Sequence, residues 1–202
     1  MTKIKLCGLS RDCDIEAANA LRPDYIGFVF AVKSRRYVPP ETAAELKQLL
    51  IPEIRAVGVF VDEAPERVAR LLNDGVIDLA QLHGSEDEGY IRRLRNLTDG
   101  LLIQAFRIRT EKDLRRAEMS TADEILLDAG AGTGTVFDWT LLQGVERRYF
   151  LAGGLNPENV RDAIRSVDPY GVDVSSGIET DSRKDQEKMA AFVAAVREEN
   201  RQ

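Results

Sequence analysis

The sequence predicts an α/β protein, a single-domain (β/α)8 barrel of eight parallel strands with some shortened helices. Eight short apolar segments alternate with charged segments of helical periodicity, which is typical of repeated βα units. Glycine-bearing segments follow the last two apolar segments, the place where such barrels bind phosphate. Because 202 residues is short for this fold, some of its helices must be reduced.

The predicted strands are runs of mostly apolar residues, at 4–7, 25–30, 56–61, 78–82, 101–107, 124–128, 149–152 and 171–175. Proline opens the helices predicted at 40–50 and 65–73, and Asn156 caps a helix that Pro157 starts. The segment 137–144 forms a short helix at most. No linker or change of composition divides the chain, so residues 1–202 are predicted to form one domain.

Alternation within the strands assigns side chains to opposite faces. In the segment 124–128, Ile125 and Leu127 lie on one face, and Leu126 and Asp128 lie on the other. In the first strand, Cys7 lies opposite the aliphatic residues. If the aliphatic faces meet the helices, Cys7 and Asp128 point into the barrel mouth. Both end their strands, and barrel enzymes keep their catalytic groups at that end.

Charge and cysteine content exclude several classes of function. A net charge of −6 with a pI near 5.0 disfavours nucleic-acid binding, which usually needs a basic surface. No apolar run approaches the length of a membrane span, and the N-terminus does not resemble a signal peptide, so we expect a cytoplasmic protein without a membrane partner. Two cysteines and one histidine make a disulfide framework or a zinc site improbable.

Two short segments predict a phosphate site. Gly153 and Gly154 follow the seventh predicted strand, and Ser175, Ser176 and Gly177 follow the eighth. Glycine lets backbone N–H groups approach an anion without a Cβ in the way. Loops on neighbouring strands can share one anion, so we expect a small phosphorylated substrate.

Seven motifs, taken together, resemble phosphoribosylanthranilate isomerase along nearly the whole chain. The resemblance lies in segments 5–9, 27–30 with 34–38, 57–61, 81–84, 127–128 with 134–135 and 137–139, 151–155, and 173–179. The family is a (β/α)8 barrel of tryptophan biosynthesis that needs no cofactor. The resemblance implies an Amadori rearrangement, in which N-(5-phosphoribosyl)anthranilate becomes the corresponding 1-deoxyribulose 5-phosphate. It leaves open whether the protein is a monomer or a homodimer.

By this resemblance Asp128 is the general acid and Cys7 the general base. Taken alone, a cysteine in a strand is more often a small buried apolar residue, and Asp128 could equally cap a turn. As a base, Cys7 needs a lowered pKa, which a nearby guanidinium could provide. As an acid at neutral pH, Asp128 needs a pKa raised by burial.

Three further residues are candidates for binding the substrate. Arg36 should meet the anthranilate carboxylate, since a guanidinium binds a carboxylate bidentately. The family usually has Ser-Pro-Arg here, whereas this chain has Ser34-Arg35-Arg36, so Arg35 is the alternative. Gln81 and His83 end the fourth predicted strand and are expected to hydrogen-bond the substrate, although a structural role for the histidine is equally consistent.

Two other functions are alternatives to phosphoribosylanthranilate isomerase activity. The related histidine-pathway sugar isomerase carries out the same rearrangement on a bis-phosphate, alone or as a dual-substrate enzyme. It needs an aspartate at the position of Cys7 and a second phosphate loop, and the segment 61–64 offers no such loop. A barrel that only binds a sugar phosphate would not need Cys7 and Asp128.

Overall fold

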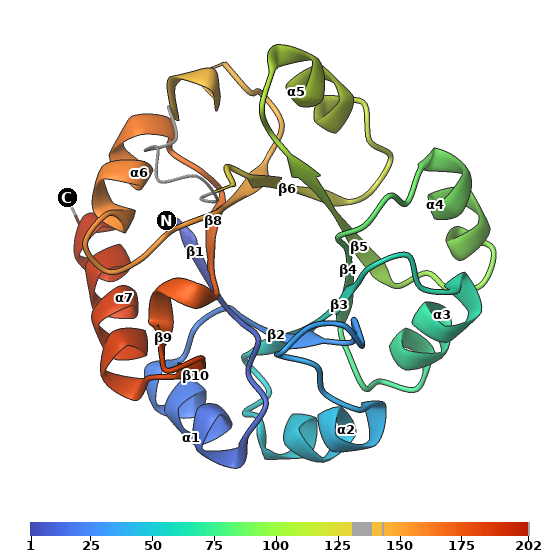
Figure 1. Ribbon diagram of the computed structural model, residues 1–202, viewed down its shortest axis with the longest axis horizontal. Coiled ribbons are helices and arrows are strands. Elements are labelled where there is room, and N and C mark those ends of the chain that lie inside the picture. The colour runs from blue at the N-terminus through green and yellow to red at the C-terminus, as the bar shows by residue number, and fades with distance from the viewer. Residues whose placement is uncertain (131–138, 143, 202) are drawn as a thin grey trace.

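The computed structural model describes residues 1–130, 139–142 and 144–201, and within them eight parallel strands close into a barrel. Each strand is hydrogen-bonded to the next in sequence, and the eighth returns to the first (Figure 1). The predicted fold class is therefore confirmed. The strands are β1 (Lys3–Cys7), β2 (Tyr25–Val29), β3 (Arg55–Phe60), β4 (Leu79–Leu82), β5 (Leu101–Arg107), β6 (Glu124–Asp128), β7 (Tyr149–Ala152) and β8 (Gly171–Val174).

Helices form the outer ring of the barrel (Figure 1). They are α1 (Asp12–Leu21), α2 (Pro40–Leu49), α3 (Pro65–Asn73), α4 (Glu88–Arg95), α5 (Glu111–Glu118), α6 (Val160–Val167) and α7 (Gln186–Glu199). Between β6 and β7 the described residues form one short 3₁₀ helix, η1 (Trp139–Leu142), as expected for a shortened unit. Over the described ranges, no helix has the length and apolar character needed to cross a membrane.

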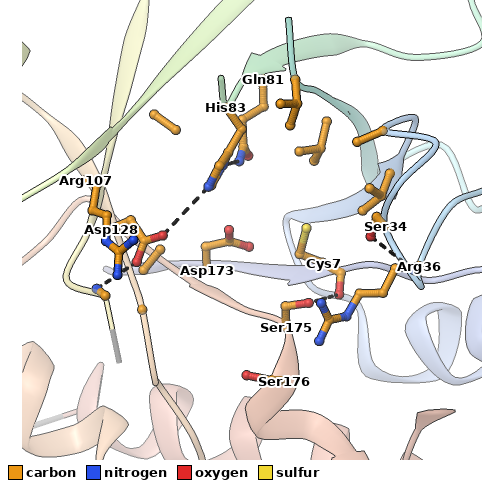
Figure 2. Close-up of a pocket in the computed structure, with 18 of the residues that line it drawn as sticks. Cys7, Ser34, Arg36, Gln81, His83, Arg107, Asp128, Asp173, Ser175 and Ser176 are labelled. Carbon is orange, nitrogen blue, oxygen red and sulfur yellow. Dashed lines mark hydrogen bonds and ion pairs between the residues drawn. The ribbon is translucent and has the colours of Figure 1, made fainter. Parts of the chain in front are cut away.

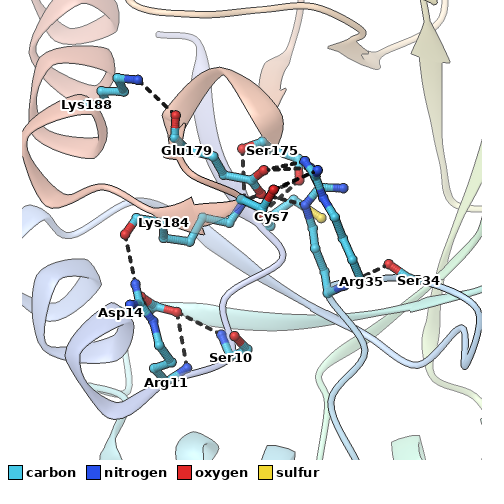
Figure 3. Close-up of polar contacts among 12 residues, drawn as sticks. Cys7, Ser10, Arg11, Asp14, Ser34, Arg35, Ser175, Glu179, Lys184 and Lys188 are labelled. Carbon is cyan, nitrogen blue, oxygen red and sulfur yellow. Dashed lines mark hydrogen bonds and ion pairs between the residues drawn. The ribbon is translucent and has the colours of Figure 1, made fainter.

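The chain between β8 and α7 carries an addition to the barrel. It consists of a 3₁₀ turn, η2 (Ser176–Ile178), and a small antiparallel hairpin of β9 (Glu179–Thr180) and β10 (Arg183–Lys184). The hairpin lies beside α1 and close to the loop that follows β2 (Figures 1 and 3). It therefore brings residues 179–184 to the mouth of the barrel.

One predicted helix start is wrong. Asn156 does not cap α6, because its side chain accepts hydrogen bonds from the N–H groups of Glu158 and Asn159 and closes a separate turn. The helix begins at Val160. Asn and Asp side chains cap isolated turns in the same way as helices, so the sequence pattern does not distinguish the two.

Side chains fill the barrel interior in layers. One layer consists of side chains from alternating positions of the strands and packs around Phe150. The Phe150 ring meets the rings of Tyr25 and Tyr170 edge-on, with 5.4 and 5.3 Å between ring centroids. Nearer the carboxyl ends of the strands lies a small cluster of Cys7, Val29 and Val59. The aliphatic positions of β1 and β6 instead face the helices, which confirms the predicted faces and places Cys7 inside the barrel.

Candidate active site

A cavity of about 660 Å³ opens at the carboxyl ends of the strands (Figure 2). Its volume suits a small organic ligand. Nine of the ten predicted site residues line it: Cys7, Arg36, Gln81, His83, Asp128, Gly153, Gly154, Ser175 and Ser176. Gly177 is the exception. Residues from the whole length of the chain thus meet at one place, at the end of the barrel where catalytic groups are expected.

Cys7 ends β1 and is 7% exposed. Its thiol occupies space left by Gly27 on the neighbouring strand, where an added Cβ would lie 2.7 Å from Cys7 Sγ. Glycine is therefore required at that position by close approach. The structure holds the sulfur in one place at the wall of the cavity.

The pKa of the Cys7 thiol is raised, whereas a lowered pKa was expected. Burial raises the pKa of the thiol above its ordinary value, and the charge of Asp173 acts in the same direction. The opposing cations include Lys5 and Lys184, and the Arg36 guanidinium also attracts the thiolate, but the pKa stays raised overall. The expected lowering is wrong because the cost of desolvating a thiolate exceeds the attraction of these cations.

Lys5 and Asp173 form an ion pair inside the barrel. Lys5 is fully buried, and its Nζ lies 2.9 Å from Asp173 Oδ1 on the adjacent strand β8. Burial lowers the pKa of Lys5, but Asp173 and Cys7 outweigh this effect and raise the pKa overall. Lys5 therefore carries its charge below the floor of the cavity, next to the thiol.

Asp128 ends β6, and its carboxylate reaches the cavity wall. Its Oδ1 accepts a hydrogen bond from the Gly130 N–H at 2.8 Å, and its Oδ2 lies 3.7 Å from His83 Nε2. Gln81 Nε2 lies 2.8 Å from His83 Nδ1 and so holds the ring (Figure 2). Arg107, which pairs with Asp128 across the β5–β6 ladder, also lines the cavity.

These neighbours shift the pKa of Asp128 in the direction opposite to the expected one. Burial raises the pKa of this carboxyl, but His83, the Gly130 N–H and the Arg107 charge together hold it below its ordinary value. The expectation of a raised pKa is therefore wrong. Donors and cations that face a carboxylate stabilise its charged form more than partial burial disfavours it.

The loops after β7 and β8 meet each other at the cavity rim. Gly153 and Gly154 adopt φ values of +96° and +68°, a region that favours glycine. A Cβ at Gly177 would lie 1.9 Å from the Leu155 carbonyl oxygen. Gly177 therefore permits contact between the two loops, whereas Gly153, Gly154, Ser175 and Ser176 line the cavity.

Arg36 and Arg35 are both paired with Glu179 of β9. Arg36 lines the cavity and binds Glu179 bidentately, at 2.6 Å from Nε to Oε1 and 2.9 Å from Nη2 to Oε2. Arg35 is exposed, and it reaches Glu179 at 2.8 Å and Ser182 at 3.0 Å. Arg36 is thus the arginine of this pair that faces the cavity.

Sequence reasoning did not find several residues at or near the cavity. Arg107 ends a predicted strand, and this position was a signal that could have identified it. Lys5 shares the inward face of its strand with Cys7, which was a second signal. Glu179 ends the last family motif, at 173–179, whereas Lys184 had no such signal, because its hairpin joins the site only through tertiary contacts. Among the described residues, no group of three or more His, Cys, Asp or Glu side chains could hold a metal ion.

Comparison with known proteins gives one consistent result. Residues 4–195 match the family model of N-(5'-phosphoribosyl)anthranilate (PRA) isomerase. N-(5'-phosphoribosyl)anthranilate isomerase of Thermoanaerobacter pseudethanolicus is 44% identical over 204 aligned residues, covering 98% of each chain.

Two solved structures have the same fold and related sequences. Phosphoribosyl anthranilate isomerase from Thermotoga maritima superposes with a TM-score of 0.90 at 36% identity, covering 98% of this chain and all of that one. A phosphoribosyl anthranilate isomerase in complex with reduced 1-(o-carboxyphenylamino)-1-deoxyribulose 5-phosphate has a TM-score of 0.88, with the same identity and coverage. The sequence and the structure of this chain together show that it belongs to the phosphoribosylanthranilate isomerase family.

Proposed function

We propose that this protein is a phosphoribosylanthranilate isomerase of tryptophan biosynthesis. It converts N-(5-phosphoribosyl)anthranilate to 1-(2-carboxyphenylamino)-1-deoxyribulose 5-phosphate by general acid–base catalysis. The observation that carries this proposal is that one cavity brings Cys7 and Asp128, from the non-adjacent strands β1 and β6, together with the glycine-bearing loops after β7 and β8 (Figure 2). Family membership and the solved complex of a relative with a phosphorylated compound support it. A single domain over residues 1–202 and a cytoplasmic site of action are part of the same proposal.

In the first step Asp128 acts as the acid. The nitrogen lone pair at C1 forms a C=N bond while the bond from C1 to the ring oxygen breaks. The ring oxygen takes the proton of the Asp128 carboxyl group, which leaves an open-chain Schiff base and a carboxylate. The donors around Asp128 stabilise that carboxylate, so they favour the product of this proton transfer.

In the second step Cys7 acts as the base. Its thiolate removes the proton from C2 of the Schiff base, and the electron pair of the C–H bond moves into a C1–C2 double bond to give an enolamine. The positive charge on the nitrogen is lost at the same time. The enolamine then becomes the aminoketose as the C2 hydroxyl loses its proton and C1 gains one. The charge of Lys5 beside Cys7 stabilises the thiolate that this step needs.

The two pKa directions set which protonation state reacts. At neutral pH the predominant state has a Cys7 thiol and an Asp128 carboxylate, because the first pKa is raised and the second is lowered. The reactive state, a thiolate with a carboxylic acid, contains the same number of protons. Its population is therefore a small and constant fraction between the two pKa values.

This arrangement predicts the pH dependence on the alkaline side. We expect kcat/KM to stay flat from pH 7 to about 8.5, the ordinary pKa of a cysteine, and to fall above it as the predominant thiol ionises. The measurement is the loss of fluorescence of N-(5-phosphoribosyl)anthranilate during turnover. A descending limb centred below pH 8 would contradict the raised pKa of Cys7. Failure of the wild-type protein to turn over this substrate would overturn the proposed function itself.

We assign three side chains to the binding of the rest of the substrate. Arg36 binds the anthranilate carboxylate with the N–H groups that Glu179 does not use. Gln81 is 1% exposed, and its Oε1 has no hydrogen-bond partner among the described residues. A buried acceptor of this kind is costly until a donor reaches it, so we assign Gln81 to a sugar hydroxyl. His83, which Gln81 holds, lies on the same side of the cavity.

The loops after β7 and β8 bind the phosphate through main-chain N–H groups. We expect Gly154→Val to raise KM by about 10- to 100-fold, since each lost hydrogen bond to a charged group costs about 1.5–3 kcal/mol. A smaller loss of kcat should accompany it, because phosphate binding also positions the sugar. Inorganic phosphate should inhibit the wild type and inhibit the variant less.

Gly75→Val is the matched control. Gly75 has φ of +72°, close to the +68° of Gly154, but it follows α3 and does not line the cavity. Both variants carry the same backbone strain, and only Gly154→Val should change KM. An unchanged KM and unchanged phosphate inhibition in a folded Gly154→Val protein would show that the phosphate binds elsewhere.

A further inference from the structure

The hairpin after β8 brings an ion cluster, built around a buried carboxylate and a buried ammonium group, close to the cavity. The cluster consists of Glu179, Lys184, Arg35 and Arg36 (Figures 2 and 3). Lys184 Nζ lies 2.7 Å from Glu179 Oε1, and the two side chains are 2% and 5% exposed. The two arginines occupy the remaining acceptor positions of the same carboxylate. The cluster holds three cations and one carboxylate, so it carries excess positive charge.

Lys184 is fixed at both ends. Its backbone carbonyl accepts a hydrogen bond from Arg11 Nη2 at 2.8 Å, and Arg11 is paired with the buried Asp14 of α1. Its Nζ donates to the carbonyl oxygen of Ser175 at 2.8 Å and lies 3.3 Å from Ser175 Oγ. The ammonium group therefore has a defined position beneath the loop that follows β8.

The same ammonium group lies next to the catalytic strand. Ser175 Oγ donates to the Cys7 carbonyl oxygen at 3.2 Å. A Cβ at Gly8, which directly follows Cys7, would lie 3.3 Å from Ser175 Oγ and 3.4 Å from Lys184 Nζ. Gly8 has φ of +83°, so glycine allows the turn, and because a Cβ there would lie 2.6 Å from Arg36 Cδ, glycine also allows the close approach of that arginine. Lys184 thus lies close to the segment that carries the thiol, without lining the cavity itself.

We propose that Lys184 is a positioning residue of the isomerase reaction, which holds the Ser175 loop and supplies, in addition to Lys5, a positive charge that stabilises the Cys7 thiolate. Glu179 keeps this ammonium group in place and ties it to Arg36. The hairpin therefore connects the base, one phosphate-binding loop and the carboxylate-binding arginine. This inference rests on the proposed function for its effect on catalysis.

Three cations act on Cys7, and Lys184 is the one of them that also holds the Ser175 loop. Lys5 of β1 is paired with Asp173 of β8, so their fields at the thiol act in opposite directions. The charge of Arg36, after β2, also interacts with Cys7, and two hydrogen bonds hold this arginine on Glu179. The ammonium of Lys184 belongs to a cluster with excess positive charge, and its attraction lowers the pKa of Cys7 against the effect of burial.

The direct test measures the ionisation of Cys7 without any substrate. In a Cys13→Ser background, the rate of alkylation by iodoacetamide is followed against pH, and the adduct on Cys7 is identified by mass spectrometry. Lys184→Gln keeps an N–H donor for the Ser175 carbonyl and removes the charge. We expect it to raise the midpoint of alkylation by about one pH unit, the usual effect of one nearby charge.

Lys188→Gln is the matched control. Lys188 is exposed and donates to the backbone carbonyl of Glu179 at 2.9 Å, so it touches the same residue from outside the cluster. Its replacement should leave the midpoint unchanged. Equal midpoints in the wild type, Lys184→Gln and Lys188→Gln would overturn the proposal.

The kinetic test follows from the small population of the reactive state. A Cys7 pKa raised by one unit lowers this population tenfold, so kcat/KM of Lys184→Gln should fall about tenfold at pH 7. Its alkaline limb should move up by the same one unit. A merely structural role would lower the rate without moving the limb, and that result would overturn the proposal.

Two further results separate the possible failures. If Lys184→Gln does not fold, as judged by circular dichroism, Lys184→Met takes its place, because it keeps the aliphatic stem, removes the charge and leaves Glu179 paired with Arg35 and Arg36. Its Cys7 midpoint should also rise, and an unchanged midpoint would overturn the proposal. A wild-type protein without turnover would refute the proposed function, while the alkylation midpoints would still decide the role of Lys184.

Discussion

Asp128→Asn should abolish most turnover while leaving the fold and substrate binding nearly unchanged. Asparagine keeps the shape of the side chain, and its carbonyl oxygen can still accept the hydrogen bond that the Gly130 N–H donates at 2.8 Å. It has no acidic proton for the ring oxygen of the substrate. The loss in kcat should be about 10²- to 10⁴-fold, the usual contribution of a positioned acid or base. Steady-state kinetics measures kcat, and titration with inorganic phosphate checks that the anion site is intact.

Asp181→Asn provides the control for this variant. Asp181 lies in the exposed turn of the hairpin with φ of +50°, a conformation that asparagine also tolerates. It does not line the cavity, so its replacement should leave kcat and KM unchanged. A kcat close to that of the wild type in Asp128→Asn would show that another group donates the proton.

Cys7→Ser should cause a loss of similar size, because an alcohol is a far weaker acid than a thiol and is almost never ionised at neutral pH. The smaller hydroxyl fits the space beside Gly27, so neither the barrel nor KM should change much. The expected result is a kcat lower by at least about 10²-fold, measured by the same fluorescence assay. Circular dichroism and urea unfolding check that the fold is retained.

The second cysteine supplies the comparison. Cys13 lies at the start of α1, half-buried, and its thiol is 3.9 Å from the Asp14 carboxylate rather than in the cavity. Cys13→Ser should leave activity nearly unchanged. Alkylation of Cys7 that left the turnover of the wild type intact would refute the assignment of Cys7 as the base.

The directions of the two pKa shifts determine which protonation state of Cys7 and Asp128 reacts. Since Cys7 is predominantly a thiol and Asp128 predominantly a carboxylate, the protein reacts through a minor protonation state. Groups that stabilise the thiolate increase that minor population. The cations behind Cys7 therefore matter to the rate although they do not touch the substrate, and this is the connection between the two catalytic residues and the hairpin.

The sequence was sufficient for the architecture and for nine of the residues that line the cavity. Strand alternation and the glycine segments are local properties of the sequence. The alternation of side chains is the same in the folded protein, because the side-chain period of a strand does not depend on its partners. This is why the faces of β1 and β6 were correctly assigned. The convergence of Cys7, Asp128 and the two glycine loops then followed from the topology, since a closed parallel barrel brings all carboxyl ends to one rim. The residues 134–135 and 137–138 of the family motifs lie outside the described part of the chain.

Tertiary structure decided the electrostatics of the site. A pKa is a balance between burial and all neighbouring charges, and the expectations for Cys7 and Asp128 considered only one contribution each. For Cys7, burial outweighs the cations, and for Asp128 the donors and cations outweigh burial. The sequence did not show this balance, because it depends on the distances among groups far apart in the chain.

The ion cluster of the hairpin illustrates the same limit most clearly. Arg36 and Glu179 are 143 positions apart in the sequence but are joined by two hydrogen bonds in the structure. Lys184 lies in a short, charged segment that reads as solvent-exposed, yet its ammonium group is buried below the cavity. The local pattern determined which fold forms and which residues end its strands. Only the folded chain determined which charges meet, because that depends on long-range contacts that no local pattern encodes.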